Sequence, residues 1–116
     1  MIIYVYLKCS TCQKALSFLK DNKIDYTMKE INVTPPSIQE LKIMLNYQGG
    51  NIKKLLNTSG MLYREMNLSH TLQNMSQEEI LSLLSSEGML IKRPFLLTKN
   101  LGLVGFKKIE WSCLEP

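Results

Sequence analysis

The sequence has little cysteine and almost no histidine, and this scarcity limits its chemistry. It contains three cysteines and one histidine in 116 residues. Three cysteines cannot form a closed set of disulfides, and a zinc site needs about four thiolate or imidazole ligands. His70 and Cys113 do not supply a second ligand pair. We therefore expect no disulfide framework, no bound metal and no other cofactor.

Long apolar runs and an export signal are also missing. No stretch reaches the roughly 20 apolar residues that a membrane-spanning helix requires. The first residues, MIIYVYL, lack a basic segment and a small-residue cleavage site. We therefore expect a protein without membrane contact in the reducing cytosol. There, a close cysteine pair is more often catalytic, redox-sensing or metal-binding than structural.

The charge is mildly positive, with a formal net value of +4. This charge could favour an acidic partner, but the lysines are scattered along the sequence, which favours an ordinary solvated surface. No basic helix and no alternation of aromatic and basic residues indicates direct nucleic-acid binding. The length and the absence of a linker predict a single domain, residues 1–116, and we expect it to be a monomer.

The first third of the chain has the pattern of a strand, a helix and a second strand. Residues 2–7 are apolar and rich in β-branched and aromatic side chains, which is typical of a buried strand. Ser10 and Gln13 have the spacing of a capping box, which predicts a helix beginning after Ser10. Residues 25–33 alternate like a second strand. Together these elements predict a right-handed βαβ unit.

Residues 34–88 form a predicted helical insertion. Serine and glutamate three residues apart predict the starts of two of its helices, Ser37 with Glu40 and Ser76 with Glu79. Gly88 is expected just after the end of the second helix. The chain then returns to the sheet, because residues 95–98 and 103–106 flank a polar turn in the manner of a hairpin. Residues 107–113 are predicted to form a short amphipathic helix.

Cys9 and Cys12 are the residues most indicative of chemistry. A C-x-x-C that follows a strand and opens a helix within a βαβ unit is typical of a redox couple. If Ser10 caps the helix, Cys9 lies at its start, where free N–H groups and the helix dipole favour a thiolate. Cys12 falls on the face that packs against the core. This arrangement favours Cys9 as the attacking thiolate and Cys12 as the resolving thiol. Metal ligands and two inert, packed cysteines are the alternatives.

Four segments together resemble the arsenate reductase (ArsC)/Spx family, of thioredoxin-like fold. They are YLKCSTCQKAL at the start, LLNTSGMLYREMNL at 55–68, NMSQEEILSLLSSEGMLIKRPFLL at 74–97 and LVGFKKIEW at 103–111. The resemblance covers nearly the whole chain and is closest to small Spx-like members that carry a C-x-x-C. It implies an α/β fold, with a thioredoxin-like βαβ-ββα core, a mixed sheet and the helical insertion. It also implies that Cys9 is the redox-active cysteine.

The resemblance further implies a set of site residues. Arg93 is expected to act with Cys9 and Cys12 as a catalytic residue, and its charge is expected to add to the helix start in lowering the pKa of Cys9. Pro94 fits the cis-proline that thioredoxin-like folds carry opposite the active cysteine. The predicted substrate-binding residues are Pro94, Ser10, Thr11, Asn57 and Arg64.

Three functions agree with this resemblance. The first is a thiol-disulfide redox protein whose partner is a thiol reductant, either glutathione with glutaredoxin or thioredoxin, or a protein disulfide. The second is a Spx-like, redox-sensing transcription regulator that binds the C-terminal domain of the RNA polymerase α subunit. The third is a glutaredoxin- or thioredoxin-linked arsenate reductase.

Two departures from the family pattern argue against arsenate as the substrate. The arsenate reductases of the family surround the cysteine with three arginines, which suits an oxyanion. Here only Arg93 matches, and the other two positions align with Asn57 and, approximately, Gly105. Those enzymes also generally lack a cysteine at the position of Cys12. Both differences favour chemistry in which Cys12 resolves a disulfide formed at Cys9.

Overall fold

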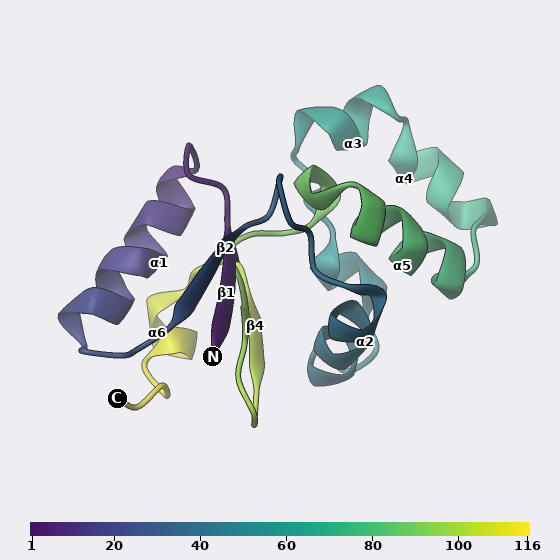
Figure 1. The fold of residues 1–116 in the computed structure, drawn as a ribbon. Coiled ribbons are helices and arrows are strands. Elements are labelled where there is room, and N and C mark those ends of the chain that lie inside the picture. The colour runs from purple at the N-terminus through teal and green to yellow at the C-terminus, as the bar shows by residue number, and fades with distance from the viewer.

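A four-stranded mixed sheet with the strand order β2-β1-β3-β4 lies at the centre of the protein. The computed structural model describes all 116 residues (Figure 1). The strands are β1 (Ile2–Val5), β2 (Thr27–Glu30), β3 (Phe95–Leu97) and β4 (Gly102–Val104). β1 pairs parallel with β2, whereas β3 is antiparallel to both β1 and β4. The predicted α/β fold, its mixed sheet and its C-terminal hairpin are thus confirmed.

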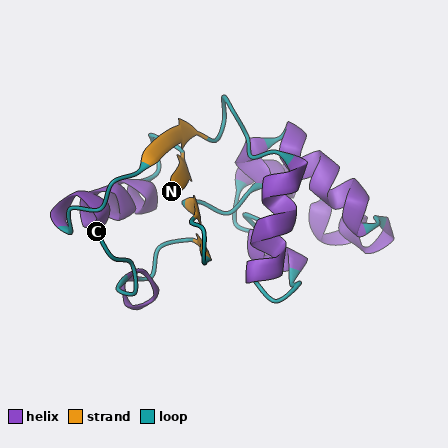
Figure 2. Cartoon of the chain, turned by 60° about the horizontal axis from the view of Figure 1, so that its bottom comes forward, coloured by secondary structure: helices purple, strands orange, loops and turns teal.

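Helices cover both faces of this sheet. The crossover helix α1 (Ser10–Asp21) and the short C-terminal helix α6 (Lys108–Trp111) lie on one face, and the insertion lies on the other (Figures 1 and 2). The α-helices of the insertion are α2 (Ile38–Tyr47), α3 (Met61–Glu65), α4 (Leu68–Thr71) and α5 (Gln77–Ser86). Three short 3₁₀ helices accompany them: η1 (Ile52–Leu55), η2 (Leu72–Asn74) and η3 (Gly88–Leu90). None of the helices combines the length and the apolar character of a membrane span.

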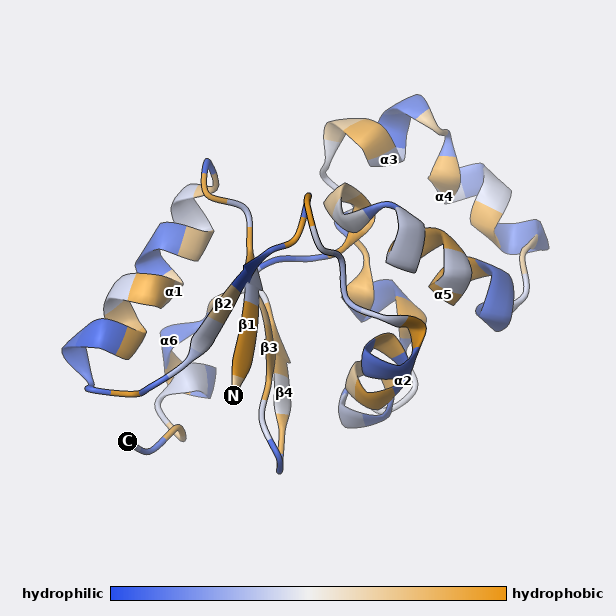
Figure 3. Ribbon diagram, in the orientation of Figure 1, coloured by the Kyte–Doolittle hydropathy of each residue, from blue (hydrophilic) through white to orange (hydrophobic).

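The core has two halves because side chains alternate across the strands. Ile3 and Val5 of β1 belong to the cluster under α1 and α6, which also contains Cys12 and Trp111. Tyr4, between them in sequence, points to the opposite face and joins the cluster formed with the insertion. The central strands are accordingly among the most hydrophobic segments in Figure 3, while the outer turns of the helices are hydrophilic. One buried strand therefore anchors both layers.

Two of the three predicted capping boxes form, and the one at Ser10 does not. In the boxes of α2 and α5, Ser37 and Ser76 exchange hydrogen bonds with the glutamates three residues on. At α1 the N-cap residue is Cys9, and no side chain caps it. The side-chain amide of Gln13 instead donates to the carbonyl of Leu7 at 2.7 Å. The predicted helix start was thus one residue too late, and Cys9 is itself the cap.

Two other predictions need adjustment. The second strand is shorter than residues 25–33, because its partner β1 ends at Val5, which pairs with Glu30. Gly88 does follow the end of α5, but its role is close packing. A Cβ on Gly88 would lie 1.8 Å from the carbonyl oxygen of Ile31. This contact holds the end of the insertion against the segment that follows β2.

Candidate functional site

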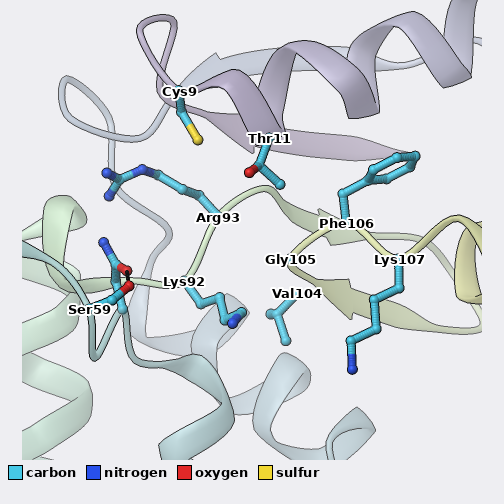
Figure 4. Close-up of a pocket in the computed structure, with 10 residues that line it drawn as sticks. Cys9, Thr11, Ser59, Lys92, Arg93, Val104, Gly105, Phe106 and Lys107 are labelled. Atoms are coloured by element: carbon cyan, nitrogen blue, oxygen red, sulfur yellow. Dashed lines mark hydrogen bonds between the residues drawn. The ribbon is translucent and has the colours of Figure 1, made fainter.

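Cys9 lies in the loop between β1 and α1, at the start of the helix. Its backbone is extended, with φ −92° and ψ 120°, and its carbonyl accepts a hydrogen bond from the N–H of Gln13 at 3.1 Å. The residue is partly exposed. Its sulfur therefore stands where the first N–H groups of α1 have no partner within the helix. In Figure 4 the Cys9 sulfur points from this loop toward the cavity.

Cys12 lies one turn into α1 and is fully buried. It packs in the core half that also contains Ile3, Val5 and Trp111. Both cysteines are free thiols in this structure. The two sulfurs therefore differ in access, because a partner can reach Cys9 but cannot reach Cys12 directly.

The two thiols also differ in acidity. Partial burial disfavours the Cys9 thiolate, but hydrogen bonds from the backbone and thiol of Cys12 and from the backbone of Thr11, followed by the charge of Arg93, outweigh it. The pKa of Cys9 is consequently lowered. Burial is the main reason that the pKa of Cys12 is raised to about 12, and interaction with Cys9 adds to it. Cys9 is therefore the more readily ionised of the two thiols, and Cys12 keeps its proton near neutral pH.

A cavity of about 360 Å³ lies beside Cys9. Its lining comes from the start of α1, the turn after η1, the loop before β3 and the segment after β4. The lining residues are Cys9, Thr11, Asn57, Ser59, Lys92, Arg93, Val104, Gly105, Phe106 and Lys107. The fold thus brings together Cys9, Thr11, Asn57 and Arg93, four of the residues that the sequence singles out.

Arg93 is held in place by its neighbours. Its guanidinium lies 5.1 Å from the centre of the Tyr6 ring, and one of its nitrogens donates to the carbonyl of Met89 at 3.3 Å. Its Nε is buried and has no hydrogen-bond partner. The bond between Arg93 and Pro94 is cis, in agreement with the position that the resemblance implied for Pro94. Arg93 is thus a fixed positive charge beside Cys9.

The remaining predicted residues do not line this cavity. Pro94 is buried next to Arg93, at the entrance to β3. Ser10 is exposed in the first turn of α1, and Arg64 is exposed on α3. By contrast, the three positions at which the family's arsenate reductases are expected to carry arginines all line the cavity. They hold Arg93, Asn57 and Gly105.

Lys92 and Lys107 line the cavity, and sequence reasoning missed both. They are separated by the β3–β4 hairpin, so only the folded chain brings them together. Lys92 precedes Arg93, and its position beside the expected cis-proline is the one signal that could have identified it. The expectation that the lysines are scattered is wrong at this site. No group of three or more His, Cys, Asp or Glu side chains is arranged to hold a metal ion.

Comparisons with known proteins find relatives in sequence and in fold over nearly the whole chain. The uncharacterised protein YusI of Bacillus subtilis is 44% identical over 97% of this chain and 95% of its own length. The global transcriptional regulator Spx 2 of Bacillus anthracis is 26% identical over 95% of this chain and 82% of its own length. An ArsC-family-related protein of Bacteroides fragilis with a solved structure has a TM-score of 0.90 and 43% identity, covering 96% of this chain and 93% of that chain.

The sequence model of the ArsC family matches residues 4–113, which include the end of β1, the C-x-x-C, the insertion and the hairpin. The match therefore spans every element that contributes to the cavity beside Cys9. On this match, and on the likeness in sequence and fold just described, the chain belongs to the ArsC family.

Proposed function

We propose that this protein is a cytosolic thiol-disulfide redox protein that uses Cys9 and Cys12 as its redox pair. The difference between the two thiols carries the proposal. Cys9 is accessible and its pKa is lowered, whereas Cys12 is buried and its pKa is raised. An attacking thiolate and a protected resolving thiol are the two roles that such a reaction requires.

The reaction follows from this division of roles. The Cys9 thiolate attacks one sulfur of a substrate disulfide, forms a mixed disulfide and releases the other sulfur as a thiolate that takes up a proton. Cys12 then loses its proton and attacks the Cys9 sulfur. This step forms the Cys9–Cys12 disulfide and releases the second substrate thiol. The substrate gains two electrons and the protein loses two, and a thiol reductant such as thioredoxin, or glutathione with glutaredoxin, returns them.

A trapping experiment tests this function. The Cys12→Ser variant should retain covalent mixed disulfides with partner proteins, because no thiol is left to release them. The Cys9→Ser variant should retain none, and Cys113→Ser should behave as wild type. Equal trapping by Cys9→Ser and Cys12→Ser would reject Cys9 as the attacking residue.

A Spx-like regulator is the second candidate, and its support is the likeness to Spx 2 over most of both chains. In this alternative the same cysteine pair is a switch that changes affinity for the C-terminal domain of the RNA polymerase α subunit. Capture of that domain by the immobilised protein, compared under oxidising and reducing conditions, tests it. Redox-dependent capture without turnover of any disulfide would favour the regulator over the first proposal.

Arsenate reduction is the third candidate. The cavity beside Cys9 is positively charged, with Lys92, Arg93 and Lys107 on its wall. It nevertheless has asparagine and glycine, Asn57 and Gly105, where the family's arsenate reductases are expected to have arginines. Lysine offers a point charge, whereas arginine offers the fixed pair of donors that suits a tetrahedral oxyanion. We therefore expect no arsenate turnover with either glutaredoxin or thioredoxin as the electron donor.

A further inference from the structure

The cavity beside Cys9 continues into a second cavity that Cys9 does not reach. The second one has a volume of about 230 Å³ and shares Lys92, Val104 and Lys107 with the first. It adds two further lysines, Lys53 and Lys54 of η1. A single cleft therefore runs from the Cys9 sulfur, past Lys92 and Lys107, to η1. In Figure 4 the side chains of Lys92 and Lys107 extend away from Cys9.

Positive charge is concentrated in this cleft. Its walls carry five cationic side chains and one carboxylate, a net charge of +4. The formal net charge of the whole chain is also +4, so the rest of the molecule is neutral on balance. The cationic residues are Lys53, Lys54, Lys92, Arg93 and Lys107, and the carboxylate is that of Glu110.

These charges have no counter-ions within the protein. The structure contains one ion pair, between Lys42 and Glu78 on the outside of the insertion. Even Glu110, which lines the second cavity, forms no ion pair with the surrounding lysines. Like charges gathered on a concave surface repel one another and attract anions from solution. The cleft is thus complementary to a ligand that carries several negative charges.

We propose that the substrate of Cys9 is a polypeptide disulfide flanked by acidic residues, whose carboxylates lie along this lysine cleft. The inference rests on the proposed thiol-disulfide function, because that function requires the ligand to present a sulfur to Cys9. Lys53 and Lys54 line the second cavity and not the cavity beside Cys9, so a ligand that contacts them must extend beyond the space beside Cys9. An extended acidic segment meets both requirements, and lysines spaced along a cleft suit carboxylates spaced along a chain.

Matched peptide disulfides test this substrate class. Each peptide has one cysteine, joined in a mixed disulfide to a neutral 2-thiopyridyl group and flanked on both sides by glycine and two glutamates, or by glycine and two glutamines. The Cys9 thiolate attacks the peptide sulfur, the bond to the pyridyl sulfur breaks and 2-thiopyridone leaves. Its absorbance reports the rate, and the protein carries Cys113→Ser to leave only the reactive pair. We expect the acidic peptide to react about tenfold faster at low salt, with the advantage shrinking as ionic strength rises.

Charge variants locate the effect. In Lys53→Gln/Lys54→Gln the ratio of acidic to neutral peptide rates should fall toward one. The control, Lys20→Gln/Lys99→Gln, removes the same total charge from the last turn of α1 and the β3–β4 turn, at the opposite end of the sheet from the start of α1 (Figure 1). It should keep the wild-type ratio. Because each ratio compares two peptides on one protein, the reactivity of Cys9 in that protein cancels, and any intrinsic difference between the two peptides is the same for every variant. An unchanged ratio in the η1 variant, or an equal loss in the control, would overturn the proposal.

Two further arms separate the sources of failure. Glutathione carrying the same 2-thiopyridyl group brings carboxylates on a short molecule. If this glutathione disulfide reacts as fast as the acidic peptide, and loses rate equally in Lys53→Gln/Lys54→Gln, the substrate is a low-molecular-weight thiol and the polypeptide proposal is wrong. Titration of the Cys9→Ser protein with the acidic peptide carrying serine in place of cysteine measures binding without chemistry. Amide shifts at Lys53, Lys54 and Lys107 without any thiopyridone release by wild type would retain the anion cleft and reject the redox function.

Discussion

The side chain of Lys92 crosses the space that a side chain at Gly105 would occupy. A Cβ built on Gly105 would lie 2.9 Å from Cε of Lys92, and the backbone of Gly105 has φ +71°, a left-handed conformation. The N–H of Gly105 donates to the carbonyl of Pro94 at 2.8 Å, which ties this turn to the cis-proline loop. Glycine at position 105 therefore makes room for a lysine from the neighbouring loop, and Lys92 adds a positive charge to the cavity where residue 105 has no side chain.

Substitution of Gly105 should separate backbone strain from the displacement of Lys92. Gly105→Ala and Gly50→Ala should both lower the free energy of unfolding by about 1–2 kcal/mol, because both backbones are left-handed. A Cβ on Gly50 meets nothing within 4 Å, so that variant is the control for strain alone. Urea unfolding measures the stability. The rate of reaction with the acidic peptide reports whether the Lys92 side chain has been displaced. Only Gly105→Ala should change that rate, and a matching change in Gly50→Ala would contradict the role given to Lys92.

Cys12 should make the protein less stable at alkaline pH. Its pKa is raised to about 12, mainly by burial, from an ordinary value of 9.0. The unfolded chain therefore loses this proton between pH 9 and 12, while the folded protein keeps it, so stability is full below pH 9 and falls as pH rises. The loss should approach about 1 kcal/mol per pH unit relative to Cys12→Ser. Urea unfolding under reducing conditions from pH 8 to 11 measures the difference, and parallel curves for the two proteins would contradict the prediction.

The order of elements and the cysteine pair could be predicted from the sequence because both depend on local patterns. Apolar runs rich in β-branched and aromatic residues identified β1, two such runs flanking a polar turn identified the hairpin, and serine-to-glutamate spacing identified the starts of α2 and α5. The same rule was wrong at Ser10, because the turn before α1 brings Leu7 within reach of Gln13, which bonds to that carbonyl instead of capping the helix. A capping box fails to form where another carbonyl lies close enough to take the hydrogen bond of the side chain at its third position.

The lysine cleft could not be predicted, because it depends on the relative placement of distant segments. Lys53 and Lys54 come from the insertion, Lys92 from the loop before β3, and Lys107 from the segment after β4. In sequence these lysines look scattered, and only the antiparallel pairing of β3 with β4 and the packing of η1 bring them together. A linear charge pattern therefore understates the clustering that a folded surface can produce.

Tyr4 should stabilise the contact between the sheet and the insertion. Its ring is buried, and its hydroxyl donates to the carboxylate of Glu40 at 2.8 Å. Tyr4→Phe should lower the free energy of unfolding by about 1.5 kcal/mol, the low end for a hydrogen bond to a charged group, because Glu40 keeps its bond from the Ser37 N–H. Tyr47→Phe is the control, since Tyr47 donates to the neutral carbonyl of Lys99 at 3.0 Å in an exposed setting. Denaturant unfolding should show the smaller loss for Tyr47→Phe, and the reverse order would contradict the prediction.

Tyr6 should tune Cys9 by positioning Arg93, although it does not line the cavity. The Arg93 guanidinium lies 5.1 Å from the Tyr6 ring centre, and its charge lowers the pKa of Cys9, after the hydrogen bonds from Cys12 and Thr11. Tyr6→Leu removes the ring and leaves the long side chain of Arg93 free to move away from Cys9. The pKa of Cys9 should therefore rise, as it should in Arg93→Ala. Tyr6→Phe keeps the ring and should leave that pKa where it is. Thiolate absorbance against pH, with Cys12 and Cys113 replaced by serine in every protein, measures all three. A rise in Tyr6→Phe equal to that in Tyr6→Leu would assign the effect to the hydroxyl, and no rise in Arg93→Ala would mean that the guanidinium does not act on the Cys9 sulfur.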